Sequence, residues 1–191
     1  MRTFIAIELS EENKATLAQV QSHLKYSGAD VKWVEPANIH LTLKFLGEID
    51  EKTCENVKSI LDEIAKTTQP FEISLKDVGA FPKIEFPRVI WVGLDKGAKE
   101  STELANKIDV ALSTEIGFDK ESRAFTAHLT IGRVRSGKNK AALKEKLLSL
   151  EEQVASSMAQ GYVVKSVILF QSTLTPTGPI YTKLHEAKFV S

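Results

Sequence analysis

The chain has 191 residues, of which 42% are hydrophobic and 26% charged, a composition typical of a soluble globular protein. Basic and acidic residues balance at 25 each, which argues against non-specific binding along a nucleic-acid duplex. No apolar run approaches the ~20 residues of a membrane span, and the N-terminal sequence lacks the long apolar region of a secretory signal. We therefore expect a cytoplasmic protein without membrane association, and the single cysteine, Cys54, agrees because it can form no internal disulfide.

The first half of the chain predicts strands and two helices. Short runs of apolar and β-branched residues indicate strands, and apolar residues at helical spacing indicate helices. Strands are expected over residues 2–9, 31–34, 40–47, 71–81 and 88–94. The first helix begins after Ser10, a residue type that caps helix N-termini. The second helix has its apolar face at Val57, Ile60, Leu61 and Ile64.

The second half repeats this order. A helix over residues 98–116 is expected to end at Gly117, since glycine commonly terminates helices. A further helix has its apolar face at Leu143, Leu147, Leu150 and Val154. Strands are expected over residues 125–134, 162–170 and 180–189, with the turn-rich segment 171–179 between the last two.

The similarity of the two halves predicts the architecture. We expect an α+β fold that is bilobal, with two pseudo-symmetric lobes. Each lobe has a mostly antiparallel sheet backed by two helices, and a central cleft lies between the lobes. Residues 1–191 then form a single domain made of two intertwined lobes.

Two of the four histidines begin the same short sequence. Residues 40–43 read His-Leu-Thr-Leu and residues 128–131 read His-Leu-Thr-Ile. Side chains alternate along a strand, so the His and Thr of each motif share one face and the aliphatic residues the other. A lone histidine on such a strand is more often a structural hydrogen-bond partner, but recurrence on equivalent strands favours a functional pair. His23 and His185 lack this context, and we expect them to be structural or exposed.

Two facing His-Thr pairs suit the hydrolysis of a strained cyclic phosphate. A neutral imidazole can take the proton of the attacking water while a protonated one gives a proton to the leaving ribose oxygen. The hydroxyls of Thr42 and Thr130, with a cation such as Arg133, would stabilise charge on the non-bridging oxygens. A catalytic zinc needs three protein ligands, which the sequence does not supply at suitable spacing, so we expect no metal and no cofactor.

A basic segment surrounds the second motif. Residues 122–144 contain no acidic residue. Their basic residues are Arg123, Arg133, Arg135, Lys138, Lys140 and Lys144. The segment is either a solvated loop and helix start or the source of a local positive field for one or two phosphates, and the sequence leaves both open.

The two motifs and their flanks resemble the two-histidine (2H) phosphoesterase superfamily, and within it the bacterial and archaeal RNA 2',3'-cyclic phosphodiesterases, also called 2'-5' RNA ligases. The resemblance extends over nearly the whole chain, most clearly at residues 31–49, 86–94, 125–134 and 169–184. It implies a single 2H phosphoesterase domain that hydrolyses RNA 2',3'-cyclic phosphate ends to 2'-phosphomonoesters without metal. Some members of the family also join RNA ends reversibly through a 2'-5' phosphodiester, so the resemblance makes this a candidate second activity.

Residue by residue, the resemblance assigns His40 and His128 as the catalytic pair, with His40 the general acid toward O3' and His128 the general base for water. It assigns Thr42 and Thr130 to hold the phosphate. Arg133, five positions after the second histidine, matches a basic residue that contacts the phosphate in relatives.

Phe45, five positions after the first histidine, matches an aromatic residue that can stack on the terminal base of the substrate. Strand alternation directs Phe45 away from His40, so this role requires a twist or bulge, and a place in the core is the alternative. In a regular strand Lys44 would share the face of His40.

Other functions remain open. A superfamily enzyme acting on ADP-ribose 1'',2''-cyclic phosphate or on 2'-5' oligoadenylate would use similar chemistry, and a non-catalytic nucleotide-binding module would use the cleft alone. A purely structural protein would make the repeated motif a coincidence. The partners we expect are RNA ends or small nucleotides with a 2',3'-cyclic phosphate. No protein partner is implied, and we expect a monomer.

Overall fold

A computed structural model describes residues 1–153 and 161–190 of the chain. Its helices are α1 (Glu11–Lys25), the 3₁₀ helix η1 (Pro36–Asn38), α2 (Glu51–Ala65), α3 (Ala98–Ile116) and α4 (Lys140–Gln153). Its strands are β1 (Arg2–Glu8), β2 (Val31–Trp33), β3 (His40–Glu48), β4 (Phe71–Ile73), β5 (Leu75–Lys83), β6 (Phe86–Leu94), β7 (His128–Val134), β8 (Tyr162–Val164), β9 (Ser166–Thr175) and β10 (Gly178–Lys188).

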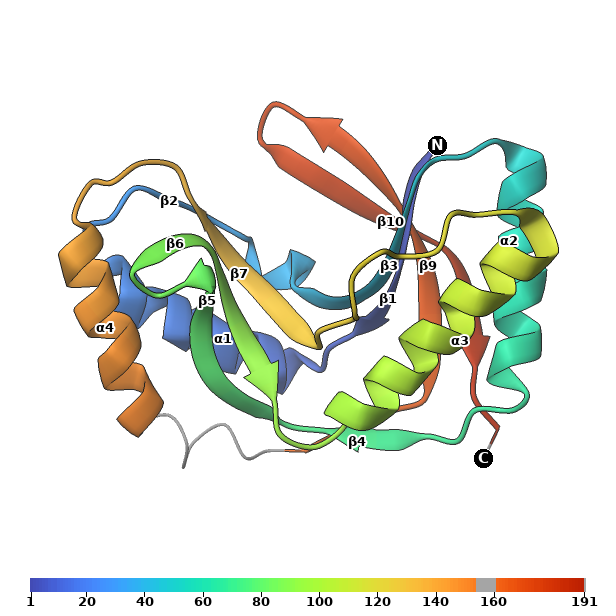
Figure 1. Cartoon of the computed structure of the whole chain (residues 1–191), viewed down its shortest axis with the longest axis horizontal. Helices are drawn as coiled ribbons and strands as arrows, with labels where there is room; N and C mark the ends of the chain where they lie inside the picture. The colour runs from blue at the N-terminus through green and yellow to red at the C-terminus, as the bar shows by residue number, and fades with distance from the viewer. Residues whose placement is uncertain (154–160, 191) are drawn as a thin grey trace.

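Two four-stranded antiparallel sheets form the two lobes (Figure 1). The first sheet has the order β10-β9-β1-β3, and the second has the order β2-β7-β6-β5. Strands β4 and β8 form a separate two-stranded sheet. The predicted α+β class with two antiparallel sheets is confirmed, and each sheet contains one strand that begins with a motif histidine.

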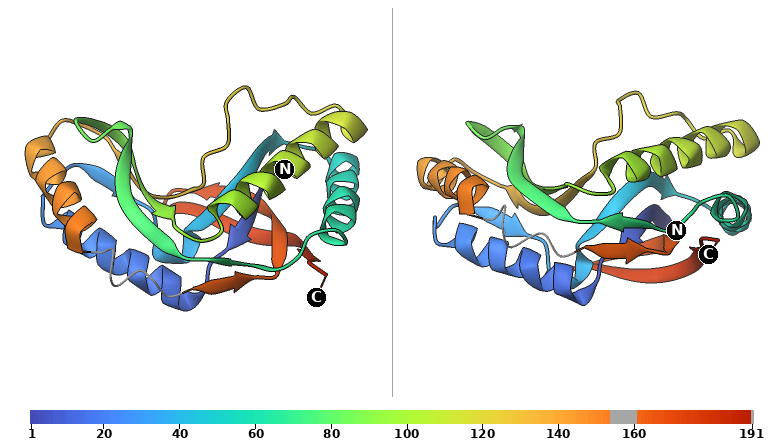
Figure 2. Two further views of the ribbon diagram at one scale, coloured as in Figure 1. Left: turned by 60° about the horizontal axis from the view of Figure 1, so that its bottom comes forward. Right: turned by 90° about the horizontal axis from the view of Figure 1, so that it is seen from below.

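Helices α2 and α3 accompany the first sheet, and α1 and α4 accompany the second (Figures 1 and 2). Helix α2 contacts β9, β10 and α3, and α3 contacts β3, so both belong to the first lobe. Helix α4 contacts β5 and α1, and α1 lies with it beside the second sheet. The expected bilobal arrangement, with two helices for each sheet, is therefore present.

The chain passes repeatedly between the lobes. Helix α1 follows β1 of the first sheet but lies in the second lobe, and α3 follows β6 of the second sheet but lies in the first. One continuous cluster of buried apolar residues draws on both sheets and all four helices. Its burial is the main source of stability.

Capping residues set the start of α1 and the end of α3 at the positions that the sequence predicts. The Ser10 side chain accepts a hydrogen bond from the backbone amide of Asn13 (3.1 Å) at the start of α1. Gly117 ends α3 with a φ of 73°, a left-handed conformation that favours glycine. In α4, Leu143, Leu147 and Leu150 are buried as predicted, whereas Val154 lies outside the described residues.

Four predicted strand boundaries are wrong. The strand expected over residues 162–170 is divided at Lys165, because β8 pairs with β4 while β9 pairs with β1 and β10. The strand expected over residues 71–81 is divided at Ser74, because β4 pairs with β8 while β5 pairs with β6. Residues 125–127 precede the ladder, which begins with the pairing of His128 and Gly93. Most of the expected loop 171–179 belongs to the β9–β10 hairpin, because pairing continues to Thr175 and Gly178 around a tight turn.

In the described part of the chain, no helix is long and apolar enough to cross a membrane.

Candidate active site

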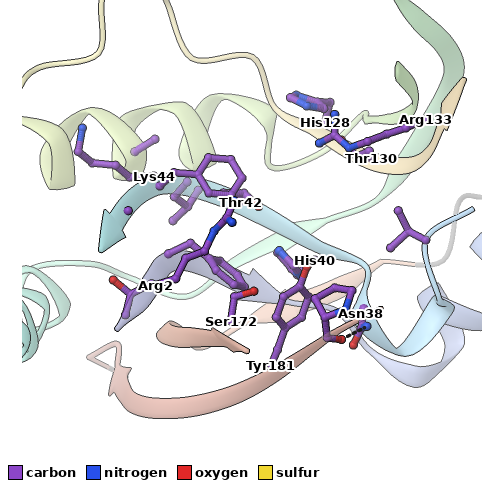
Figure 3. A pocket seen from close by; sticks show the side chains of 18 of the residues that line it. Arg2, Asn38, His40, Thr42, Lys44, His128, Thr130, Arg133, Ser172 and Tyr181 are labelled. Carbon is purple, nitrogen blue, oxygen red and sulfur yellow. Dashed lines mark hydrogen bonds between the residues drawn. The ribbon is translucent and has the colours of Figure 1, made fainter. Parts of the chain in front are cut away.

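A cleft of about 980 Å³ lies between the two sheets (Figure 3). One wall is formed by residues of β1, β3, β9 and β10, and the other by residues of β2 and β7 together with the segment 121–126. All six sequence-predicted residues line it, namely His40, Thr42, Phe45, His128, Thr130 and Arg133. The structure thus brings all the candidate residues together in one cavity.

The motif strands orient their side chains as strand alternation predicts. On β3, Leu41 is buried in the core while His40 and Thr42 face the cleft. On β7, Leu129 is buried likewise beside the cleft-facing His128. The aliphatic residues therefore anchor each strand, and the polar residues of the motif are left to the cleft.

A bulge follows the motif threonine in each strand. On β3, Thr42 pairs with Ala6 and Lys44 with Ile5, so Leu43 is an extra residue. Phe45 consequently pairs with Phe4 on the cleft face and is 68% exposed, which agrees with the interpretation that a bulge would bring it there. The alternative of a core position for Phe45 is wrong.

The bulge on β7 has the same effect on Arg133. Thr130 pairs with Trp91 and Gly132 with Ile90, so Ile131 is extra, and Arg133 lies on the cleft face. Without this bulge, Arg133 would point away from His128, because the two positions differ by an odd number.

Buried Gln21 of α1 holds the second bulge in place. Its Nε2 donates to the carbonyl oxygens of Ile131 (2.9 Å) and Val34 (2.7 Å). The sequence carried a signal for it, since Gln21 lies on the helix face of the apolar residues Leu17 and Leu24. A polar side chain there needs a buried partner.

His40 lies among aromatic rings. It stacks on Phe4 with ring centroids 4.7 Å apart, and Tyr181 meets it edge-on at 5.2 Å. Burial lowers the pKa of His40 from 6.5 to about 4, a hydrogen bond with the Asn38 backbone opposes the shift, and the charge of Lys14 adds to it. His40 is therefore neutral in the free protein near pH 7.

His128 has a different environment. Its Nδ1 lies 2.7 Å from the carbonyl oxygen of Thr126, and Phe81 meets the ring edge-on at 5.1 Å. A carbonyl oxygen only accepts hydrogen bonds, so Nδ1 carries a proton and Nε2 of the neutral ring has the free lone pair. This tautomer can accept a proton at Nε2.

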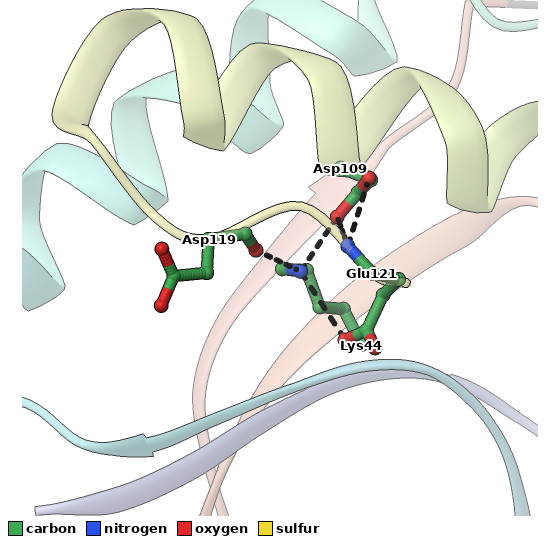
Figure 4. A network of polar contacts seen from close by, with 4 residues as sticks. All are labelled: Lys44, Asp109, Asp119 and Glu121. Carbon is green, nitrogen blue, oxygen red and sulfur yellow. Dashed lines mark hydrogen bonds and ion pairs between the residues drawn. The ribbon is translucent and has the colours of Figure 1, made fainter. Parts of the chain in front are cut away.

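A buried ion pair joins β3 to α3, and further contacts of the same lysine hold the segment between α3 and β7 (Figure 4). The Nζ of Lys44 contacts Oδ1 of Asp109 (2.6 Å), Oε1 of Glu121 (3.3 Å) and the carbonyl oxygen of Asp119 (3.2 Å). Asp109 also accepts a hydrogen bond from the Glu121 amide (3.2 Å). Burial alone would raise the pKa of Asp109, but the hydrogen bonds from Lys44 and Glu121 and the Lys44 charge lower it below 3.8. The bulge explains the burial of Lys44, since it turns this residue away from the His40 face.

The basic segment 122–144 divides between the two expected roles. Arg123 and Arg133 line the cleft. The other four basic residues of the segment are absent from its walls, and Lys140 instead lies over the Phe86 ring at 3.9 Å. Only part of the segment can therefore supply a local positive field to the cleft.

The remaining histidines lie away from the cleft walls. His185 Nε2 contacts Oδ1 of Asp62 (2.7 Å), and His23 Nε2 lies 3.4 Å from Oγ of Ser149. Within residues 1–153 and 161–190, no three His, Cys, Asp or Glu side chains are grouped so that they could hold a metal ion.

Sequence reasoning missed three cleft residues, Arg2, Ser172 and Tyr181. Burial raises the pKa of Tyr181, and the charges of Arg133 and Arg2 oppose this shift. The phenol is therefore within electrostatic range of guanidinium groups from both walls. Ser172 lies in the segment 171–179 that the sequence predicts as a loop, whereas Tyr181 lies in the predicted strand 180–189. Arg2 is an ordinary residue for a strand start.

Comparison with known protein families shows the same two-fold repeat of the chain that the two His-x-Thr motifs indicate. A family model described as LigT like Phosphoesterase matches the chain twice, at residues 7–91 and 92–181, so each match contains one motif. The RNA 2',3'-cyclic phosphodiesterase of Methanocaldococcus jannaschii is 40% identical over 186 residues, which cover 97% of this chain and 99% of the relative. The protein of the same description from Archaeoglobus fulgidus is 38% identical over 185 residues, with coverage of 96% and 98%.

Solved structures share the fold. The protein TT0787 of Thermus thermophilus matches with a TM-score of 0.80 and 26% identity, over 99% of this chain and 98% of that one. Escherichia coli LigT complexed with 3'-AMP matches with a TM-score of 0.76 and 23% identity, over 100% and 98% of the two chains.

Proposed function

The chain belongs to the LigT-like phosphoesterase family, and from this premise we propose that it hydrolyses the 2',3'-cyclic phosphate at the end of an RNA strand. The observation that carries the proposal is the presence of both His-x-Thr motifs on opposite walls of one cleft. The full-length relatives described as RNA 2',3'-cyclic phosphodiesterases support the same substrate. The protein is accordingly a phosphodiester hydrolase.

The two histidines transfer the protons. His128 Nε2 takes a proton from water as the water oxygen bonds to phosphorus, and His40 gives a proton to O3' as the P–O3' bond breaks. The product is a 2'-phosphomonoester with a free 3'-hydroxyl. The hydrogen bond between His128 Nδ1 and the Thr126 carbonyl supports its role as base, because it leaves the lone pair at Nε2.

His40 requires the substrate for its role as acid. With a pKa of about 4 it is neutral in the free protein. A bound phosphate places a negative charge beside the ring, which favours the protonated form and raises the pKa. His40 therefore takes up a proton when the substrate phosphate binds, and this is the proton that it gives to O3'.

The other cleft residues hold the substrate. Thr42 and Thr130 donate hydroxyl hydrogen bonds to the non-bridging oxygens, and Arg133 supplies a charge-assisted pair of donors. Phe45 offers an exposed ring on which the terminal base can stack, a contact that tolerates any base. No step assigns a role to a metal.

Reversible 2'-5' ligation follows from the same proton transfers. If the 5'-hydroxyl of a second RNA replaces water, its proton passes to His128 and its oxygen bonds to phosphorus. The P–O3' bond again breaks with proton transfer from His40, and a 2'-5' phosphodiester results.

The test is incubation of the purified protein with an RNA that ends in a 2',3'-cyclic phosphate, followed by analysis of the monoester formed. We expect a 2'-phosphate in excess EDTA, and at least about 100-fold slower product formation by His128→Ala. ADP-ribose 1'',2''-cyclic phosphate and a 2'-5' oligoadenylate serve as comparison substrates. If either of these is hydrolysed faster than the RNA end, that compound and not the RNA end is the preferred substrate. A 3'-phosphate product would mean that the P–O2' bond breaks instead of the P–O3' bond.

A further inference from the structure

The cleft carries more positive charge than one phosphate requires. Its basic side chains are Arg2, Lys32, Lys44, Arg123 and Arg133, and its acidic ones are Glu35, Asp109 and Glu121. Both Asp109 and Glu121 contact Lys44, so the charge of this lysine is fully compensated within the group. The cleft of a chain with zero net charge thus has an excess of two positive charges, which suits a ligand with two negative charges.

Arg2 is the cation best placed for a second anion. Within the described residues, it forms no salt bridge. Its cross-strand neighbour Glu48 instead contacts the amino group of Met1 (3.2 Å). That amino group also donates to the carbonyl oxygen of Ile49 (2.7 Å), so the backbone around Arg2 is fixed while its side chain is exposed to the cleft.

Ser172 provides a hydroxyl beside it. Thr3 pairs with Gln171, so Arg2 and Ser172 lie at adjacent positions on neighbouring strands and face the same side as Phe4. Both line the cleft, on the wall opposite Arg133 (Figure 3). A guanidinium with a hydroxyl is the same donor combination as Arg133 with Thr130.

This pair is separated from the motif residues. Thr42 is opposite Ala6, four residues from Arg2, which is about 13 Å along β1. Phe4 and Phe45 occupy the interval on the same face. The Arg2 side chain spans part of this distance, and the rest leaves room for the sugar and base of one nucleotide over the aromatic rings.

We propose that Arg2 and Ser172 form a second anion subsite, which binds the phosphate on the 5' side of the terminal nucleotide. The inference rests on the proposed function, since it places the cyclic phosphate at the motif residues and the terminal base at Phe45. The subsite makes the end of an RNA chain a better substrate than a free nucleoside 2',3'-cyclic phosphate, which lacks the second phosphate.

Two substrates that differ only in this phosphate test the subsite. They are adenosine 2',3'-cyclic phosphate and its 5'-phosphorylated form. We expect the wild-type kcat/KM to be about 10- to 100-fold higher for the 5'-phosphorylated substrate, the span of a hydrogen bond to a charged group. Arg2→Gln should bring the ratio near one, and Ser172→Ala should lower it less. The preference should also weaken with added salt.

Two arginine variants serve as matched controls. Arg88→Gln changes an exposed strand arginine outside the cleft walls, and Arg123→Gln changes another cleft arginine. Both should keep the wild-type ratio. A wild-type ratio near one, a ratio that survives Arg2→Gln, or a ratio lost only in Arg123→Gln would overturn the subsite.

Equilibrium binding separates failure of the subsite from failure of the proposed function. The dissociation constants of adenosine 2',5'-bisphosphate and adenosine 2'-monophosphate can be measured without turnover. Wild type should bind the bisphosphate about 10-fold or more tightly, and Arg2→Gln should bind both alike. If neither cyclic phosphate is hydrolysed, the proposed function fails while this comparison still decides the subsite.

Discussion

Phe45 and Arg133 occupy equivalent positions in the two lobes. Each lies five residues after a motif histidine and just beyond a bulge that turns it to the cleft face. The sequence repeat thus extends past the His-x-Thr motif into the irregularity that follows it. One lobe uses the position for an aromatic ring and the other for a cation, which is how a symmetric frame can bind an asymmetric ligand.

Phe45→Ala tests the aromatic half of this relationship. Loss of stacking on one base costs about 1–3 kcal/mol, so KM for an RNA cyclic phosphate should rise roughly 5- to 150-fold. The free energy of unfolding should change little, because the Phe45 ring is 68% exposed. Phe86→Ala is the matched control, since Phe86 is 58% exposed and lies outside the cleft walls. Equal KM values for the two variants would remove Phe45 from the substrate site.

Much of the fold follows from local sequence signals. The helix after Ser10 and the end of α3 at Gly117 are set by residues that act within one turn. The motif strands are set by alternation, and the repeated His-Leu-Thr sequence identifies the site because recurrence is visible without a structure. The histidines and threonines could therefore be placed in one cleft from the sequence.

The rest depends on pairing between distant segments. A bulge is a mismatch between two strands, so the cleft-facing position of Arg133 cannot be derived from β7 alone. Burial of Lys44 depends on Asp109, which is 65 positions away. The role of Arg2 depends on Ser172, at the other end of the chain, and a strand-start arginine carries no local signal for it.

Lys44→Met should destabilise the protein by about 3–5 kcal/mol, because it leaves the Asp109 carboxylate without its buried partner. The side chains are 3% and 17% exposed, so solvent screening is weak. Urea unfolding measures the change. Limited proteolysis should cut the segment between α3 and β7 sooner, since Lys44 also holds Asp119 and Glu121.

An exposed ion pair provides the comparison. Lys66 and Glu63 form a pair on the surface of the protein, with side chains 66% and 71% exposed. Lys66→Met should cost less than about 1 kcal/mol. In a double-mutant cycle, Lys44→Met and Asp109→Asn should be strongly non-additive. Additive effects, or a cost no larger than that of Lys66→Met, would show that the buried pair contributes little.

The low pKa of His40 makes stability depend on pH. Its value is about 4 in the folded protein against an ordinary 6.5, so between these values the unfolded state binds a proton that the folded state does not. The contribution is therefore fully present above pH 6.5 and is lost as the pH falls toward 4. From about pH 7 to about pH 5 the loss is roughly 2 kcal/mol. Asp109 titrates below this window.

Urea unfolding of wild type and His40→Gln near these two pH values isolates the effect. The variant should lose less stability, and a loss as large as that of wild type would assign the dependence to other groups. NMR titration of the His40 ring gives the pKa directly. A nucleoside 2'-monophosphate should raise it by about 1–3 units, as an adjacent opposite charge does.

The anion-holding residues can be tested by removing one donor at a time. Thr42→Ala and Thr130→Ala should each lose roughly 2–4 kcal/mol of transition-state stabilisation, measured as kcat/KM. Arg133→Ala should be at least as harmful because its hydrogen bonds are charge-assisted, and Arg133→Lys should recover only part. Near-full activity in all of these variants would mean that the phosphate does not bind between the two strands.

The histidine pair gives the most direct test. His40→Ala and His128→Ala should each lower kcat by at least about 100-fold, within the range of general acid–base groups. The double variant should be little worse than either single one, because groups that act as a unit are strongly non-additive. His23→Gln and His185→Gln are the controls, since both residues lie away from the cleft walls.

The pH dependence of turnover distinguishes a proton-transferring pair from two binding residues. One imidazole must be neutral while the other is charged, so the wild-type pH–rate profile should be bell-shaped. Its two apparent pKa values belong to the coupled pair, and the NMR titration is needed to assign them. If activity survives the loss of either His40 or His128, or if the profile is flat from about pH 5 to about pH 8, proton transfer by this pair is excluded. Both histidines would then have a structural role, and the repeated motif would reflect only the similarity of two strands.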